Sequence, residues 1–177
     1  MFEGWENFFL MAGGAAAVLI GLIFVVISLM GDRPRSMVLA GSKLYMGPIV
    51  LSVSFVLVFS AAALVPDISR VTIAEISSLV AAWGLVRAVM SSKGIGGLNR
   101  IGKEQVHWTD LWFYGLFPVA IYLGTASVAI AFWEDLSWAQ NGLAVVIVLK
   151  LLLAIRNEWD LITWITPRGE DTHGSAR

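Results

Sequence analysis

The chain contains no cysteine and few charged residues. Asp, Glu, Lys and Arg make up only 14% of its 177 residues, whereas soluble domains average about 25%. The hydrophobic share is 58% and the mean hydropathy is +0.78. These values predict an integral membrane protein. The missing cysteine excludes disulfides, thiolate nucleophiles and thiolate metal ligands.

The chain also lacks the motifs that indicate an enzyme or a metal site. Its two histidines, His107 and His173, are not part of an H-E-x-x-H pattern. The glycine-rich segment 93–97 lacks the Gly-Lys-Ser/Thr of a phosphate-binding loop, and we interpret it as a flexible turn. We therefore expect no enzymatic activity, no metal ion and no bound cofactor. The net charge of -1 gives no indication of nucleic-acid binding.

Long apolar runs dominate the sequence instead. A helix rises 1.5 Å per residue and the hydrocarbon core is about 30 Å thick, so about 20 apolar residues are needed to cross it. The fold class predicted is an all-α polytopic bundle with five transmembrane spans, at about 8–30, 44–66, 71–90, 111–133 and 136–156. The first run is too long for a signal peptide, whose apolar region has about 7–15 residues, and acidic residues precede it.

The spans form a single membrane domain over residues 1–166. Its last part, 157–166, is predicted to be a helical extension that lies at the inner membrane surface. The remaining residues, 167–177, are polar and small, and we expect them to be a disordered tail.

Basic residues indicate the orientation of this domain. If all five segments cross the membrane, eight basic residues fall on one side: Arg33, Arg35, Lys43, Lys93, Arg100, Lys103, Arg168 and Arg177. The other side has Arg70 alone. Because short cytoplasmic loops collect Lys and Arg, the N-terminus is predicted outside and the C-terminus inside.

The first span carries small residues at steps of four. Gly13, Ala17 and Gly21 leave one helix face with almost no side chain. Such a face lets another helix approach closely. We interpret it as a helix-packing face, with the partner being either another helix of this chain or a second copy.

Lys150 is the charged residue placed deepest in a predicted span. It lies about 18 Å from the outer boundary of a helix that needs about 30 Å to cross. A charge at that depth costs about 2.5–3.5 kcal/mol, which makes it a functional candidate. Asn157 follows two turns later on the same face. Either Lys150 extends toward the inner surface, or Lys150 and Asn157 line a polar cavity in which the hydroxyls of Tyr122 and Thr125 solvate the ammonium.

Three further charged residues lie near the ends of predicted spans. Glu75 is close to the outer end of its span, and Arg87 and Asp110 are both near the inner surface. The simplest interpretation is that all three are boundary residues with solvated head groups. Arg87 and Asp110 are also candidates for an ion pair between neighbouring helices.

Two local patterns carry a resemblance. They are Trp5-Glu-Asn-Phe-Phe with the apolar run that begins at Gly14, and Arg156-Asn-Glu-Trp-Asp-Leu at 156–161. The chain resembles a family of small, uncharacterised bacterial integral membrane proteins. The resemblance implies a multi-pass location in the bacterial inner membrane, and it assigns no functional residue.

The scarcity of polar groups and the short loops favour a structural or regulatory membrane component. The alternative is a small homo-oligomeric channel or transporter with a polar path past Lys150 and Asn157. A third hypothesis is an intramembrane enzyme that uses Glu75 or Lys150. The expected partners are the lipid bilayer, a second copy of the chain or another membrane protein, and no nucleic acid.

Overall fold

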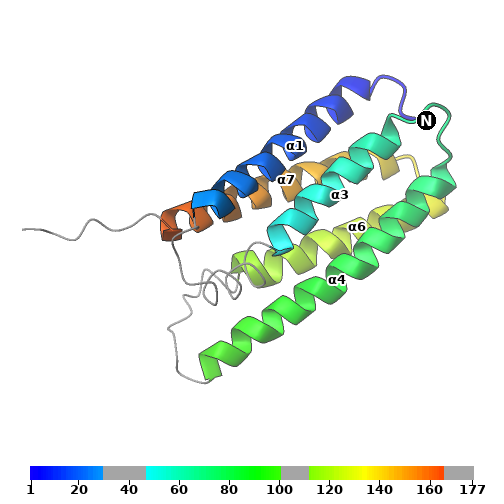
Figure 1. Ribbon diagram of the computed structural model, residues 1–177. Helices are drawn as coiled ribbons and strands as arrows, with labels where there is room; N and C mark the ends of the chain where they lie inside the picture. Colours follow the sequence, from blue (N-terminus) through cyan, green and yellow to red (C-terminus); the bar gives the residue numbers. More distant parts are fainter. Residues whose placement is uncertain (30–46, 101–111, 166–177) are drawn as a thin grey trace, which may run out of the picture.

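The computed structural model describes residues 1–29, 47–100 and 112–165, and within these ranges every regular element is a helix. The elements are α1 (Glu6–Leu29), α3 (Gly47–Ala63), α4 (Arg70–Arg100), the π-helical turn η2 (Trp112–Leu116), α6 (Phe117–Trp133) and α7 (Ala139–Ile165). The five α-helices lie side by side as an elongated bundle (Figure 1). The prediction of an all-α helical bundle is confirmed.

Three of these helices are long and apolar enough to cross a membrane. The segments are Glu6–Ser28, Arg70–Met90 and Ala139–Ile162. The helices α3 and α6 are apolar but have 17 residues each, or about 26 Å at 1.5 Å per residue. Large apolar side chains cover the outside of the bundle as well as its interior; Leu10, Phe24, Leu79 and Trp83 are each at least 60% exposed. A membrane location accounts for this apolar exterior.

Hydrogen bonds hold three segments together at one end of the bundle (Figure 1). Arg70, at the start of α4, donates to the carbonyls of Phe132 and Trp133 at 3.4 and 3.2 Å, and its Nη1 is 3.7 Å from the Asp135 carboxylate. Gln140 donates to the Met1 carbonyl at 2.7 Å. The N-terminus, the α3–α4 connection and the α6–α7 connection therefore share one end.

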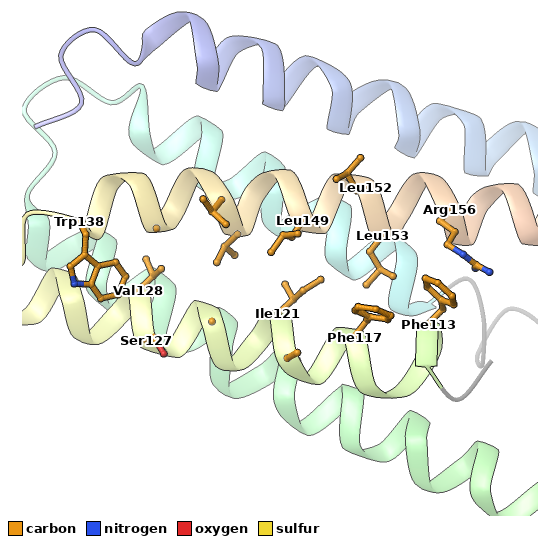
Figure 2. A pocket seen from close by; sticks show the side chains of 15 residues that line it. Phe113, Phe117, Ile121, Ser127, Val128, Trp138, Leu149, Leu152, Leu153 and Arg156 are labelled. Carbon is orange, nitrogen blue, oxygen red and sulfur yellow. The ribbon is translucent and has the colours of Figure 1, made fainter. Parts of the chain in front are cut away.

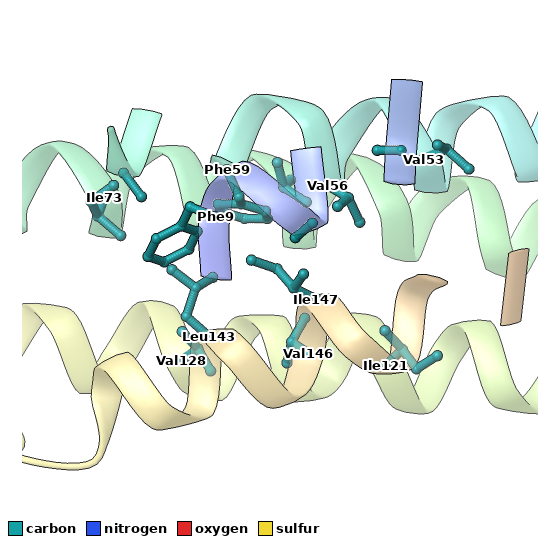
Figure 3. Close-up of a cluster of buried hydrophobic side chains, with 14 of the residues drawn as sticks. Phe9, Val53, Val56, Phe59, Ile73, Ile121, Val128, Leu143, Val146 and Ile147 are labelled. Atoms are coloured by element: carbon teal, nitrogen blue, oxygen red, sulfur yellow. The ribbon is translucent and has the colours of Figure 1, made fainter. Parts of the chain in front are cut away.

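The core forms where the five α-helices meet. Phe9, Phe59, Ile73 and Leu143, from α1, α3, α4 and α7, are fully buried and lie close together in Figure 3, and Val128 of α6 lies beside Leu143. Along α1 the buried positions recur at steps of three and four, which is the period of one helix face; they are Phe9, Ala12, Ala16, Leu19, Ile23 and Val26.

The small-residue face predicted on α1 is displaced from this buried face. Gly13 is half-buried, and a Cβ added there would lie 3.1 Å from the Cβ of Ser60 on α3. Ala17 and Gly21 are exposed, and among the described residues no atom lies within 4 Å of a Cβ placed at Gly21. Against the described residues the face therefore packs at Gly13, and not at Ala17 or Gly21. Contact with a second copy stays a prediction.

A close-packing face instead occurs on α4, where the sequence analysis did not predict one. Five small residues at steps of three and four are all buried: Ala74, Ser77, Ala81, Gly84 and Ala88. Small side chains let two helix backbones approach. This face allows α4 to pack along α6, its most extensive helix neighbour.

Helix α4 continues further than the sequence indicated, whereas α7 ends close to the expected position. The segment 93–97, interpreted as a flexible turn, belongs to α4, so that interpretation was wrong. Each helical Gly costs about 1 kcal/mol relative to Ala, but extending an existing helix avoids the larger cost of nucleation. The expected extension over 157–166 is the continuous last part of α7 as far as Ile165, and Leu161 within it is buried in the bundle. The tail at 167–177 lies outside the described residues.

Candidate functional site: a buried lysine between aromatic rings

Lys150 points into the bundle. Its position on α7 continues a buried face with steps of three and four, which comprises Leu143, Ile147, Lys150, Ala154, Asn157 and Leu161. Only 1% of Lys150 is exposed. Of the two interpretations drawn from the sequence, extension of Lys150 to a membrane surface is therefore wrong, because the face that carries it packs against other helices.

Two aromatic rings surround the Lys150 ammonium. Nζ lies 3.7 Å from the ring centroid of Tyr122 on α6 and 5.8 Å from that of Phe55 on α3. The two rings are nearly perpendicular, with their centroids 6.2 Å apart. The faces of aromatic rings attract cations, by about 2 kcal/mol or more where water is excluded. Among the described residues Nζ has no hydrogen-bond partner.

The expected solvation of Lys150 by hydroxyl groups is not what the structure shows. Thr125 is fully buried, but its hydroxyl donates to the Ile121 carbonyl of its own helix at 2.9 Å. Tyr122 contacts the ammonium through its ring face. Ring electrons are therefore the main electrostatic partner of the lysine.

Gly84 makes room for the Tyr122 ring. A Cβ placed at Gly84 would overlap ring atoms of Tyr122. The small residue on α4 thus lets the ring lie between α4 and α6, where it reaches the ammonium from α7. The close packing of α4 on α6 and the position of Lys150 consequently depend on the same ring.

A small cavity lies beside Tyr122. Its volume is about 30 Å³, and a water molecule needs about 10–15 Å³ measured in this way. Its polar lining includes Ser52 of α3, Arg87 of α4 and Asn157 of α7, and Tyr122 lines it too. Ser52 and Asn157 are buried and Arg87 is half-buried. The cavity has room for about two water molecules.

Glu158 is a buried carboxyl group that the sequence analysis did not single out. It is 5% exposed, and its Oε1 has no hydrogen-bond partner among the described residues. Eight residues of helix separate it from Lys150, an axial distance of about 12 Å. The signal that could have found it is the buried face of α7, which continues beyond residue 155 to Leu161.

The other candidates do not join this site. Glu75 is exposed on the surface of α4, so it faces no interior cavity, contrary to the requirement of the intramembrane-enzyme hypothesis. Asp110 lies outside the described residues, and its pairing with Arg87 stays a prediction. His107 and His173 also lie outside, and within the described part of the chain no three acidic or histidine side chains group as metal ligands.

The site thus joins a lysine held by two aromatic rings to a cavity with room for about two water molecules. It contains Lys150, Asn157, Arg87 and Tyr122 of the residues named from the sequence, and it adds Phe55, Ser52 and Gly84. Comparisons with protein-family models, with curated proteins and with solved structures find no match to this chain.

Proposed function

We propose that this protein is a structural or regulatory component of the bacterial inner membrane that acts by binding other membrane components, and is neither an enzyme nor a transporter. One observation carries the proposal: the deepest charge of the bundle, Lys150, is enclosed by Tyr122 and Phe55. A cation held between rings of two other helices favours one relative arrangement of α3, α6 and α7 over others, because a different arrangement would leave the charge without the rings. The resemblance to bacterial membrane proteins supports the location.

The proposed topology has five spans, with the N-terminus outside and the C-terminus inside. The contacts of Arg70 and Gln140 support it, because they join the three segments expected outside at one end of the bundle. The distribution of basic residues sets the direction.

Cysteine accessibility tests the topology without interference, because the native chain has no cysteine. Ser69→Cys and Ser137→Cys are expected to react with a membrane-impermeant maleimide in intact spheroplasts. Ser42→Cys, in the segment between the first two spans, is expected to react only after permeabilisation. Labelling of Ser42→Cys from outside would overturn the orientation.

The second candidate function is a small homo-oligomeric channel or transporter. The cavity beside Tyr122 favours it, because Ser52, Arg87 and Asn157 bring polar atoms into the bundle next to the lysine site. In that case Lys150 would control a polar path, and its charge would alter ion selectivity.

Ion flux in proteoliposomes discriminates between the two functions. The full-length protein is reconstituted and potassium, sodium and chloride fluxes are compared with those of protein-free vesicles. We expect no flux above the protein-free control and no effect of Lys150→Ala. Ion-selective flux that Lys150→Ala alters would overturn the structural or regulatory proposal in favour of the channel.

A further inference from the structure

A long apolar groove runs between α6 and α7. Its volume is about 700 Å³, and among its fifteen lining residues Ser127 and Arg156 are the only ones with a hydroxyl or a charge. Val145, Leu149 and Leu152 on its α7 side are 57%, 43% and 58% exposed. Figure 2 shows the side chains of the two helices along the groove. It opens on the outside of the bundle, where a membrane protein meets lipid.

The two ends of the groove differ in chemistry (Figure 2). At one end the Trp138 ring lies against Gly142, where an added Cβ would be 2.8 Å from the ring and 3.0 Å from Val128. At this end α7 approaches Val128 of α6 closely, and the Trp138 ring lies beside the contact. At the other end the guanidinium of Arg156 lies 3.4 Å from the centroid of Phe113. The apolar groove therefore ends at a cation.

The π-helical turn η2 shapes this cationic end. It places Phe113 in a stacked pair with Phe117, with centroids 5.1 Å apart and an angle of 25° between the rings. Arg156 also pairs with Asp160 through Nη1. A guanidinium has five N–H donors, so this one contact leaves it able to bind a second anionic group.

The length of the groove matches one lipid chain. From Arg156 to Gly142, fourteen residues of helix cover about 21 Å, and one leaflet with its headgroup region is about 20–22 Å thick. A transmembrane helix of a partner would have to continue past the Trp138 ring, which lies against Gly142 at this end of the groove. A chain that enters at the Arg156 end and stops below Trp138 fits without that conflict.

We propose that the groove binds one acyl chain of an anionic phospholipid whose phosphate contacts Arg156. Arg is suited to this role because its planar donors match phosphate geometry. The inference rests on the proposed function, since it names the membrane component that the protein binds. The lipid would lie in the leaflet at the Arg156 end, which is the inner leaflet in the proposed topology.

The test is native mass spectrometry of the full-length protein in a mild detergent. Phosphatidylglycerol and phosphatidylcholine with the same acyl chains are titrated separately. We expect one phosphatidylglycerol per chain, bound about tenfold more tightly than phosphatidylcholine, because the choline cation beside the phosphate of phosphatidylcholine is repelled by the guanidinium. Arg156→Gln is expected to abolish this preference, and Arg156→Lys to retain part of it.

A matched pair of variants tests the groove itself. Val145 lines the groove and Val148, three residues later on α7, is 41% exposed and is not among the lining residues. Val145→Trp is expected to weaken both lipids about tenfold by filling the groove, and Val148→Trp to leave both unchanged. Circular dichroism confirms that each variant is folded.

Three outcomes would overturn the inference: equal affinity for the two lipids, an Arg156→Gln variant that keeps the preference, or Val145→Trp and Val148→Trp behaving alike. A lipid-free dimer that Val145→Trp disrupts would also overturn it, because a second copy would then cover the groove. Flux in proteoliposomes separates the two proposals. Ion flux with intact lipid binding refutes only the proposed function, and absent flux with absent lipid binding refutes only the lipid site.

Discussion

Replacing Lys150 with Met is expected to stabilise the protein by about 1 kcal/mol. A charge near the middle of the bilayer costs about 2.5–3.5 kcal/mol, and a desolvated cation–π contact returns about 2 kcal/mol. Met keeps an unbranched side chain of similar length, so the packed site is not emptied. Nζ lies 3.7 Å from the Tyr122 centroid, so most of the returned free energy comes from that ring.

A double-mutant cycle measures this ring contribution directly. Tyr122→Leu removes the ring and is expected to cost about 2 kcal/mol more in the presence of Lys150 than in the Lys150→Met background. Tyr122→Phe keeps the ring face and should show little of this difference. The free energy of unfolding is measured by SDS titration of the purified protein in mixed micelles, followed by circular dichroism.

Two results would refute the reasoning. Independent sites show coupling energies below about 0.5 kcal/mol. A value in that range for Lys150 and Tyr122 would mean that the ammonium and the ring make no cation–π interaction. A loss of more than about 2 kcal/mol in Lys150→Met alone would mean that the charge is strongly satisfied by groups other than the rings, in the range expected for breaking a buried charge network.

Two further predictions concern the packing of Gly84 against Tyr122 and the contacts of Arg70 at the end of the bundle. Gly84→Ala is expected to destabilise the protein by about 1–3 kcal/mol because the methyl group overlaps the Tyr122 ring. Its control, Gly21→Ala at an open position of α1, should stabilise the protein by up to about 1 kcal/mol. Equal effects of the two variants in the same SDS titration would contradict the packing argument. Arg70→Ala should cost about 1 kcal/mol, since it removes contacts to two carbonyls at the end of α6. Asp135→Asn should cost less than about 0.5 kcal/mol because an exposed pair at 3.7 Å contributes little, and the reverse order would refute this assignment.

Much of the fold follows from the apolar runs, since length and hydropathy locate the helices within a few residues. The end of α4 does not follow, because this helix continues into sequence whose polarity resembles a loop. The extension of α7 was expected, but its burial at Leu161 was not. Hydropathy reports where a helix meets lipid. It does not report where backbone hydrogen bonding stops, since a helix can extend beyond the apolar run that nucleates it.

The sequence predicts which polar residues of the spans belong to the site, but it does not predict which side chains contact them. Lys150 stands out because a charge in a span is costly, and Asn157 follows from the helical period. Tyr122 was expected beside Lys150 through its hydroxyl. The contact with its ring face and the contribution of Phe55 could not be derived, since both rings come from helices whose rotation about their own axes depends on packing. The same reason explains why the close-packing face was predicted on α1, at Gly13, Ala17 and Gly21, although it lies mainly on α4. Both helices have small residues at this spacing, and spacing alone does not show which helix face points into the bundle.

The polar cavity and the apolar groove are separated by two side chains. Ile121 of α6 and Leu153 of α7 line both spaces. On one side of these two side chains is the small cavity, which is lined by Arg87 and Asn157 and has room for about two water molecules. On the other side is the apolar groove, which is suited to an acyl chain. Tyr122 directly follows Ile121 in the chain and holds the Lys150 ammonium. The seam between α6 and α7 therefore separates the cavity beside Tyr122 from the groove, and the contact between Lys150 and the Tyr122 ring ties the two helices together at this seam.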